Sequence, residues 1–249
     1  MNITWNIEKT DIRLVKRIVE KHQNHPFVQN RIERNFSNKE NICLPEFWHV
    51  LVACLLAFKE RSGFDSPVTN FLNKKPFPFS HDVFISNGNI YNYTKRILNS
   101  IYGFKRPATI AGQLRTNFIR LRGGLWVKMD GLLKDLQSEE SPEMERQVAE
   151  FIDTHFKGFG PMQSRNLLQS LGLTKFEIPV DTRIIKWLNE SIFSLKFSAP
   201  DLSDRNFYNI VSDGFQHLCK QCGVYPCVLD AVVFASYDKG KWAGQNIVW

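Results

Sequence analysis

The chain has 249 residues, of which 43% are hydrophobic and 23% charged, and its formal net charge is +7. This length and apolar content predict a protein with a substantial core, built as one large domain or as two smaller ones that share a cleft. No apolar run approaches the roughly 20 residues that cross a bilayer, and the first residues lack the apolar stretch of a signal peptide, so we expect an intracellular protein without membrane contact.

The basic excess favours a polyanionic partner. There are 32 Lys and Arg against 25 Asp and Glu, and the sequence pI is about 9.2. A protein that neutralises phosphates releases their condensed counterions, which favours binding of basic proteins to nucleic acid. The charges are scattered and form no long run, so any binding surface must be assembled by folding. The five cysteines are an odd number and do not indicate a disulfide scaffold.

Apolar residues recur at helical spacing along nearly the whole chain, which predicts an all-α fold. A first helix is expected over residues 12–19. Residues 44–58 are apolar on all sides, which predicts a buried central helix. The best candidate for a strand, residues 77–89, is expected to be a loop.

Serine, proline and glycine mark where the later helices start and stop. These helices are expected over residues 89–103, 107–124 and 141–156, and from about Asp204 and Pro226. The second of them should stop at the Gly-Gly pair at its end. No internal repeat and no low-complexity linker interrupts the series.

The stretch "KGFGPMQ" (residues 157–163) predicts a tight turn between two helices. Gly158 and Gly160 allow positive φ angles and close approach of the backbone, and Pro161 is typical of the first position of a helix. The free N–H groups at such a helix start attract anions, phosphate among them. Two helices joined in this way form a helix–hairpin–helix, although a plain helical hairpin with a glycine stop fits these residues equally well.

A lone acid follows in "EIPVDTR" (residues 177–183). Asp181 lies at the expected start of the next helix, where aspartate commonly caps the first turn. The combination of the glycine hairpin with this acid about twenty residues later is far more specific than either feature alone.

Together, the Gly158–Phe159–Gly160 turn and Asp181 in its "PVDTR" context resemble the helix–hairpin–helix DNA glycosylase superfamily, which includes endonuclease III and 8-oxoguanine DNA glycosylase. The resemblance spans roughly residues 44–238 and is specific only over 157–183. It implies an all-helical fold in which two helical lobes surround a DNA-binding cleft, with the hairpin at the centre.

The resemblance also implies how the chain is divided. Residues 1–249 would form a single glycosylase unit, with a hairpin-containing lobe of about residues 60–180 and a second lobe made of residues 1–59 together with 181–249.

The implied activity is excision of a damaged base from duplex DNA by hydrolysis of the N-glycosidic bond. Breaking this bond develops positive charge at C1′ of the sugar, so a carboxylate at that point stabilises the transition state or orients a water molecule. The resemblance gives this role to Asp181. The residues expected to contact DNA are Lys157, Gly158, Phe159, Gly160, Gln163, Lys59 and Arg183, and those expected to line the base pocket are Asp230, Phe234 and Phe58.

Met162 stands where bifunctional members of the superfamily carry a lysine whose amine attacks C1′. A thioether cannot form a Schiff base, so the sequence favours a monofunctional enzyme that uses water. The alternative is a glycosylase with AP-lyase activity, either because Met162 replaces a natural lysine or because Lys59 or Lys157 acts in its place.

The damaged base is expected to be an oxidised purine of the 8-oxoguanine type, because residues 223–236 look like the segment that lines the base pocket of those enzymes. An alkylated purine is the alternative substrate. The alternative from another class is a non-enzymatic module that keeps the hairpin for phosphate contacts.

Metal binding is not expected at the run of His217, Cys219, Cys222 and Cys227. An iron–sulfur cluster of the endonuclease III type needs four cysteines beyond the last helix, and this run has three that precede it. We expect no cofactor, although the resemblance allows a monovalent cation at the hairpin. The expected protein is a monomer that acts on double-stranded DNA with a damaged base, within the cytoplasm and nucleoid or the nucleus.

Overall fold

The computed structural model describes residues 4–37, 41–58, 66–193 and 196–238. Over these residues the chain is helical and contains no β-strand, which confirms the predicted all-α fold. The elements are α1 (Lys9–His22), α2 (Pro26–Phe36), α3 (Leu44–Ala57), α4 (Pro67–Leu72), α5 (His81–Ser86), α6 (Ile90–Asn99), α7 (Pro107–Arg120), the π-helical segment η1 (Leu121–Leu125), α8 (Trp126–Ser138), α9 (Pro142–His155), α10 (Pro161–Ser170), α11 (Thr182–Ser191), the 3-10 segment η2 (Asp201–Ser203), α12 (Arg205–Cys222) and α13 (Pro226–Tyr237).

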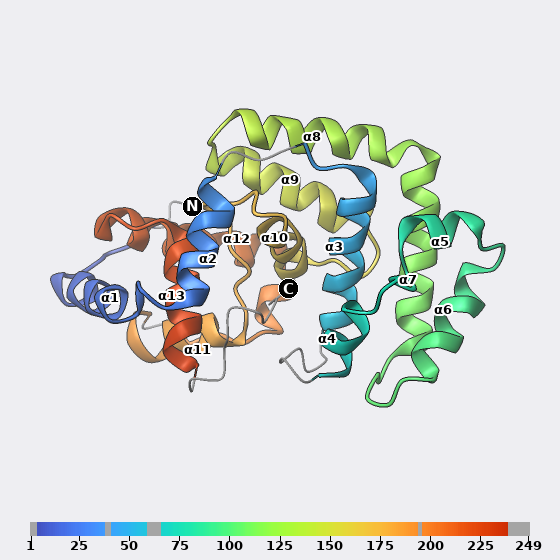
Figure 1. Cartoon of the computed structure of the whole chain (residues 1–249). Coiled ribbons are helices and arrows are strands. Elements are labelled where there is room, and N and C mark those ends of the chain that lie inside the picture. Colours follow the sequence, from blue (N-terminus) through green and yellow to red (C-terminus); the bar gives the residue numbers. More distant parts are fainter. Residues whose placement is uncertain (1–3, 38–40, 59–65, 194–195, 239–249) are drawn as a thin grey trace.

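The helices pack around two separate hydrophobic cores. The first core contains buried residues from Ile42 to Leu173 and is built by α3 to α10. The second combines α1 and α2 with α11, α12 and α13. Figure 1 shows the first lobe on the right and the second on the left, with α10 between them. The second lobe was predicted to include residues 1–59, but the buried residues of α3 lie in the core of the hairpin lobe.

The buried central helix predicted from the sequence is α3. Phe47, Trp48 and Leu51 are completely buried, and the indole Nε1 of Trp48 donates a hydrogen bond of 2.9 Å to the carbonyl oxygen of Phe79. Neighbouring helices α4, α5, α7 and α10 contact α3, which explains why it is apolar on all sides.

The prediction of a loop over residues 77–89 was wrong in part, because helix α5 lies within this range. The hydroxyl of Ser80 caps this helix by accepting a hydrogen bond from the Val83 N–H at 3.4 Å. Phe84 anchors the helix against Trp48, with ring centroids 5.2 Å apart. Six residues make fewer than two turns, so the sequence shows too little periodicity to reveal such a helix.

The stop predicted at the Gly-Gly pair is a sharp bend within continuing helical structure. Gly124 has φ +105° inside η1, a backbone conformation that favours glycine. Figure 1 shows α8 turning away from the direction of α7 and running along α9. The bend lets α7 run beside α6 while α8 covers the top of the first core.

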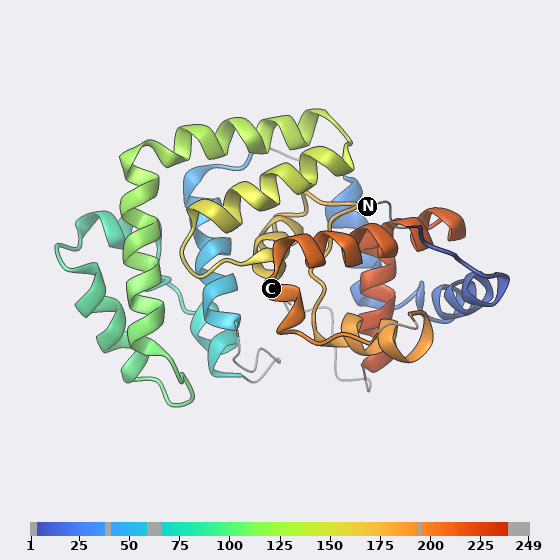
Figure 2. The ribbon, with the colours of Figure 1, turned by 180° about the vertical axis from the view of Figure 1, so that it is seen from behind.

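In the reverse view α12 lies in front of α10 and runs toward α13 (Figure 2). Among the described helices, none alone has the length and apolar composition of a membrane span. The pair α12 and α13 passes that test only when taken together, and the two helices are bent by 94° relative to each other.

Candidate active site

The turn between α9 and α10, residues 156–160, is anchored in the first core. Phe156 and Phe159 are both buried, and their rings meet edge to face with centroids 6.4 Å apart. Phe159 is therefore a core residue, and its side chain does not face solvent as a DNA contact would. What the turn offers to the outside is its backbone.

Gly158 is required by the geometry of the turn. Its φ angle is +91°, and a Cβ atom at this position would lie 2.6 Å from Leu55 Cδ2 and 2.7 Å from Gln113 Cδ. The positive φ angle disfavours any residue with a Cβ atom here, and such an atom would also require the Leu55 and Gln113 side chains to shift. The first hairpin glycine is thus explained by folding.

Lys157 is held by the side chain of Asn117 on α7. The Lys157 N–H donates to Asn117 Oδ1 at 2.7 Å, and Asn117 Nδ2 donates to the Lys157 carbonyl oxygen at 2.9 Å. This N–H group is therefore already paired in the free protein. The exposed ammonium of Lys157 is the part of the residue that stays accessible to an anion.

Gly160 lies in a different environment. Its φ of −117° and ψ of −170° describe extended backbone that any residue adopts, and no heavy atom lies within 4 Å of a Cβ built on it. Glycine at this position leaves the first turn of α10 open. Because Pro161 has no N–H, the N–H groups of Met162 and Gln163 are the ones that the helix leaves without an intrahelical acceptor, and an anion can bind them.

The carboxylate of Asp181 caps helix α11, as the sequence predicted. Its Oδ1 accepts hydrogen bonds from the N–H groups of Arg183 at 2.8 Å and Ile184 at 3.1 Å. Its Oδ2 accepts from Arg183 Nε at 2.7 Å and from Arg183 Nη2. The Asp181 side chain is 23% exposed, so the fixed carboxylate still reaches the surface.

The segment that leads into Asp181 is fixed by the phenol of Tyr208. The Val180 N–H donates to Tyr208 Oη at 2.8 Å, and the phenol donates to the Ile178 carbonyl oxygen, also at 2.8 Å. Tyr208 is completely buried, and burial raises the pKa of its hydroxyl. The phenol therefore stays protonated and keeps both bonds.

Arg165 connects this segment to the hairpin. Its Nη1 donates to the carbonyl oxygen of Pro161 at 3.1 Å, and its guanidinium lies 4.5 Å from the centroid of the Tyr208 ring. Its Nε donates to Glu177 Oε2. One fully buried cation thus joins the first turn of α10 to the chain that carries Asp181.

Glu177 is the acceptor at the centre of this network. In addition to Arg165, its carboxylate binds Arg146 through Nε at 2.9 Å and Nη2 at 2.7 Å, Gln216 Nε2 at 2.9 Å and the Ser212 hydroxyl at 3.2 Å. Burial alone would raise the pKa of Glu177, but the charges of Arg165 and Arg146 outweigh it and lower the pKa. No motif in the sequence predicts this network.

A second buried acid, Glu145, holds the backbone of residues 175–177, which precede Asp181. The Glu145 carboxylate accepts three backbone hydrogen bonds, from the N–H groups of Lys175 at 2.6 Å, Phe176 at 2.8 Å and Glu177 at 2.7 Å. Burial raises the pKa of Glu145 to about 7, and the three donors oppose this rise. A side chain of α9 therefore fixes the backbone that follows α10.

Asp230 lies in a polar contact on the buried side of α13. Its Oδ2 accepts hydrogen bonds from Arg31 Nη1 at 3.1 Å and from Gln169 Nε2 at 2.6 Å. Burial raises the pKa of Asp230 to about 6, Arg31 lowers it, and the charge of nearby Asp181 raises it further. The two acids expected in the site are therefore close enough to influence each other.

The ring of Phe234 is covered on two sides. The ring of Phe27 is 4.1 Å from its ring, centroid to centroid, and the Arg183 guanidinium lies 4.3 Å from its centroid. In the free protein one arginine therefore contacts both Asp181 and Phe234.

Phe58 lies at the end of α3 in the first lobe. The Arg106 guanidinium lies 5.2 Å from its ring centroid and donates to its carbonyl oxygen. Phe58 thus belongs to a different lobe from Phe234. Lys59, which follows it, lies outside the described residues.

Met162 is partly buried in the first turn of α10 and packs against the second core. Its thioether therefore contacts the lobe that carries Asp181. Cys219 and Cys227 are buried in that same core, and burial raises the pKa of Cys227 to about 12, which favours the thiol over a metal-binding thiolate. Among the described residues, no group of three or more His, Cys, Asp or Glu is placed to hold a metal ion.

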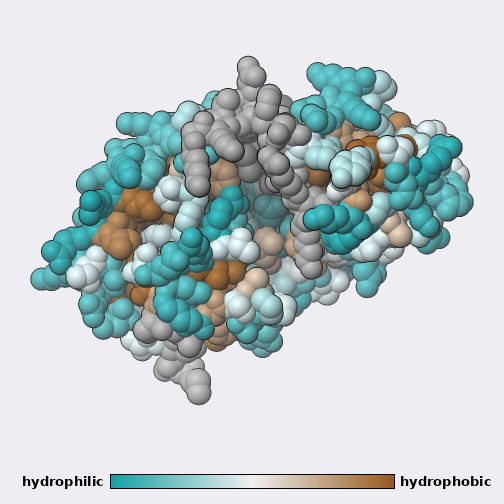
Figure 3. Space-filling model, turned by 90° about the horizontal axis from the view of Figure 1, so that it is seen from below, coloured by the Kyte–Doolittle hydropathy of each residue, from teal (hydrophilic) through white to brown (hydrophobic). Residues whose placement is uncertain are grey.

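Seen from below, the molecular surface is hollowed near its centre, and both hydrophilic and hydrophobic residues are visible around the hollow (Figure 3). The hairpin helix α10 lies between the lobes in Figure 1, so the site combines residues of both.

Solved structures with this architecture are 8-oxoguanine DNA glycosylases. That of Thermotoga maritima is 15% identical and has a TM-score of 0.65 over 93% of this chain and 98% of its own. That of Methanocaldococcus jannaschii is 16% identical, with a TM-score of 0.64 over 96% of this chain and 100% of its own. The glycosylase/lyase of the same organism, in complex with a 15mer DNA containing 8-oxoguanine, is 15% identical, with a TM-score of 0.62 over 93% and 100%.

No protein-family model and no curated protein sequence matches the chain. The structural similarity extends over more than nine-tenths of its length. The chain therefore has the fold of the helix–hairpin–helix 8-oxoguanine glycosylases, as the glycine hairpin and the "PVDTR" segment led us to expect.

Proposed function

We propose that this protein is a DNA glycosylase, which hydrolyses the N-glycosidic bond of a damaged base in duplex DNA. The observation that carries the proposal is the partly exposed carboxylate of Asp181, held through Tyr208 and Arg165 in a fixed relation to the first turn of α10. The fold that the chain shares with three solved structures of 8-oxoguanine glycosylases supports it. We infer that the substrate base is an oxidised purine of the 8-oxoguanine type.

The proposed chemistry depends on charge. As the base departs, the sugar gains oxocarbenium character, and a nearby carboxylate stabilises it or activates the attacking water. In the free protein, Arg183 neutralises part of the Asp181 charge. The Arg183 side chain is 43% exposed, so it can turn to a DNA phosphate and release the carboxylate for catalysis.

DNA would be held through its backbone and the base would be turned out of the helix. The N–H groups of Met162 and Gln163, with the ammonium of Lys157, supply phosphate contacts at the open side of Gly160. An extruded base needs a stacking partner and hydrogen-bond acceptors. Phe234 and Asp230 supply these once Arg183 has moved from the Phe234 ring.

The proposed product is an abasic site. Met162 occupies the position from which a lysine would attack C1′, and its thioether cannot form the Schiff base. The rival is a glycosylase with AP-lyase activity that uses Lys157 or Lys59, and one of the structural neighbours is described as a glycosylase/lyase. The protein would act as a monomer inside the cell, where DNA is found.

Labelled duplexes that each carry one lesion test the proposal: 8-oxoguanine, an alkylated purine, hypoxanthine or uracil. Each reaction is divided, and one half is treated with alkali before the strands are separated. Cleavage of the 8-oxoguanine strand only after alkali is the expected result. Cleavage without alkali would show that a lysine acts, and cleavage of another duplex would identify a different base.

Replacing the carboxylate separates an enzyme from a DNA-binding module. Asp181→Asn keeps a good helix cap and should lower the single-turnover rate by about 100-fold or more, as loss of a charge-stabilising group does. The matched control is Asp204→Asn, because Asp204 caps α12 by accepting the Phe207 N–H at 2.8 Å. Equal rates for both variants and the unmodified protein would remove Asp181 from the mechanism.

A further inference from the structure

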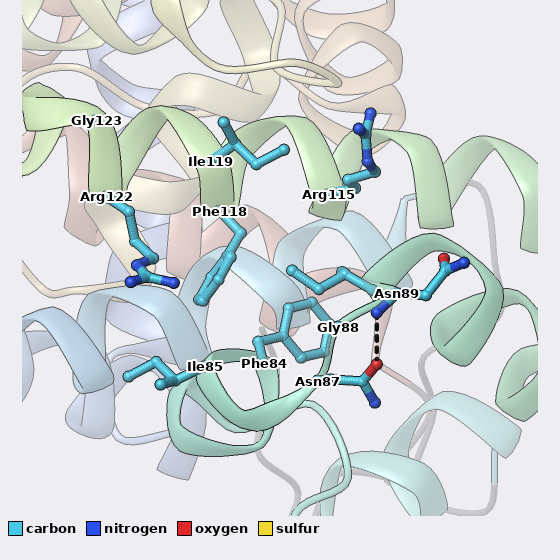
Figure 4. A pocket seen from close by; sticks show the side chains of 11 residues that line it. Phe84, Ile85, Asn87, Gly88, Asn89, Arg115, Phe118, Ile119, Arg122 and Gly123 are labelled. Atoms are coloured by element: carbon cyan, nitrogen blue, oxygen red, sulfur yellow. Dashed lines mark hydrogen bonds between the residues drawn. The ribbon is translucent and has the colours of Figure 1, made fainter.

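A groove of about 630 Å³ lies on the first lobe, between α5, the turn that follows it, α7 and η1. Figure 4 shows Phe118 and Arg122 pointing from α7 and η1 toward α5, with Phe84 and Ile85 facing them. The volume falls within the range of sites that bind a ligand or a few side chains of a partner. None of the residues assigned above to catalysis or base binding lines it.

The groove has an apolar floor and an apolar rim. Phe84 and Phe118 form the floor and are almost completely buried, whereas Ile85 and Ile119 line the groove with half of their surface exposed. Large aliphatic side chains that are exposed beside a concave surface are typical of a place where a partner buries apolar groups.

The charged residues that line the groove are all basic. Arg115 and Arg122 are exposed, and no acidic residue is among the lining residues. The Arg122 guanidinium lies 5.9 Å from the centroid of the Phe118 ring, so it is held at the apolar floor. Residues 67–134 contain eleven Lys and Arg but only two acidic residues. Charge complementarity therefore requires an acidic occupant.

The groove is already formed in the free protein. Asn87 Oδ1 accepts the Asn89 N–H at 3.1 Å, and Asn89 Oδ1 caps α6 by accepting the Asn92 N–H at 3.1 Å. The opposite wall includes Gly123, at the bend where α7 passes into α8. A preformed wall lowers the entropic cost of binding.

Helix α7 separates the groove from the hairpin. Asn117 binds Lys157, and Arg120 Nη1 donates to the carbonyl oxygen of His155 at 2.5 Å. Arg115 and Ile119 project from the opposite face, because neighbours on one helical face are three or four residues apart. An occupant of the groove can therefore bind while the hairpin holds another ligand.

We propose that this groove binds a short acidic segment of another protein, which pairs its carboxylates with Arg115 and Arg122 and buries an aliphatic or aromatic side chain between Ile85 and Ile119. A helix with apolar residues at i, i+3, i+4 and i+7 fits such a groove. The phosphates of DNA would satisfy the arginines, but they would leave both isoleucines exposed. The proposal does not depend on the glycosylase activity.

The test is a titration of the full chain, labelled at the isoleucine δ1 methyl groups, with a synthetic helical peptide that has Leu and Phe on one face and Glu on the other. The methyl signals of Ile85 and Ile119 should shift. A peptide with Gln in place of Glu should bind about tenfold more weakly, because the charge complementarity is lost. Arg115→Glu with Arg122→Glu should have a similar effect on the acidic peptide.

The matched control replaces two exposed arginines of α1, as Arg13→Glu with Arg17→Glu, and should leave the affinity unchanged. Thermal unfolding of both double variants checks that the fold is intact. The proposal would be overturned if the two methyl signals did not move at about 1 mM peptide, or if isoleucines of both lobes shifted alike. It would also be overturned if a DNA duplex shifted the same two signals and displaced the peptide.

Discussion

Replacing Glu177 with Gln should strongly destabilise the protein, because it removes the charge that compensates Arg165. Both side chains have no exposed surface, so water cannot replace the lost partner. Glutamine has nearly the same size and still offers an acceptor, so the change tests charge rather than packing.

The expected loss follows from burial. Removing one partner of a buried ion pair costs about 3–5 kcal/mol, because the remaining charge is left uncompensated. Most domains unfold with a free energy of about 5–15 kcal/mol, so the loss is a large share of the total. In a protein of this size each kcal/mol lowers Tm by about 2–4 °C, which gives an expected fall of roughly 6–20 °C.

Urea unfolding measures the loss as a shift of the midpoint with an unchanged slope. The surface pair of Lys134 and Asp130, 2.6 Å apart with the lysine side chain 55% exposed, supplies the control. Asp130→Asn should change the free energy of unfolding by less than about 1 kcal/mol. In a double-mutant cycle, Arg165→Met combined with Glu177→Gln should cost less than the two single changes added together.

Acid unfolding gives a second measurement of the same pair. Folding lowers the pKa of Glu177. The carboxylate therefore contributes its full stabilisation at pH values above the ordinary pKa of 4.5. This stabilisation is lost as the pH falls through the lowered pKa of the folded protein. Glu177→Gln should remove that part of the acid dependence. A loss below about 1 kcal/mol at neutral pH, equal to that of Asp130→Asn, would refute the reasoning.

Three further predictions concern the site. Gly158→Ala should lower Tm by several degrees through strain and close contact, whereas Gly160→Ala should leave Tm unchanged and weaken DNA binding measured by fluorescence anisotropy; equal Tm values would contradict this. Tyr208→Phe leaves two buried backbone groups of residues 178–180 without a hydrogen-bond partner, which should lower the free energy of unfolding in urea by about 2–4 kcal/mol. The single-turnover rate should also fall, and an unchanged rate would show that the phenol does not position Asp181. Since folding raises the pKa of Asp230 from 3.8 to about 6, stability should fall as the pH rises through this interval, and a series of urea midpoints for Asp230→Asn should lack this fall.

The sequence revealed most of the long helices, because these have enough turns to show their periodicity and end at recognisable caps, but it did not reveal α2 or α8. The helix over residues 141–156 is one example, since Ser141 caps it through the Met144 N–H at 3.2 Å. The six-residue helices α4 and α5 escaped detection because fewer than two turns give no clear pattern. The segment η1 escaped because a Gly-Gly pair usually ends a helix, whereas here it bends one.

The network behind Asp181 could not be assembled from the sequence, because its members come from α9, α10, α12 and the segment between α10 and α11. One local signal was present. Arg165 lies three residues before Leu168 on the buried face of α10, and Glu177 stands directly before Ile178 in a buried segment. A charged side chain at an apolar position of this kind needs a partner when it is buried, but the neighbouring sequence does not identify that partner.

The two hairpin glycines show how a fold requirement differs from a functional one. At Gly158 the positive φ angle disfavours any side chain, and a Cβ atom would also displace Leu55, so folding alone explains the residue. At Gly160 the backbone is extended and the surrounding space is empty, so nothing inside the free protein requires glycine. We propose that glycine serves here to let a ligand approach the first turn of α10 closely. That turn offers N–H donors and a positive helix end, and Arg165 ties it to the segment that carries Asp181. A bound phosphate would therefore be held in register with a carboxylate, which is the arrangement that a reaction on a nucleotide sugar needs.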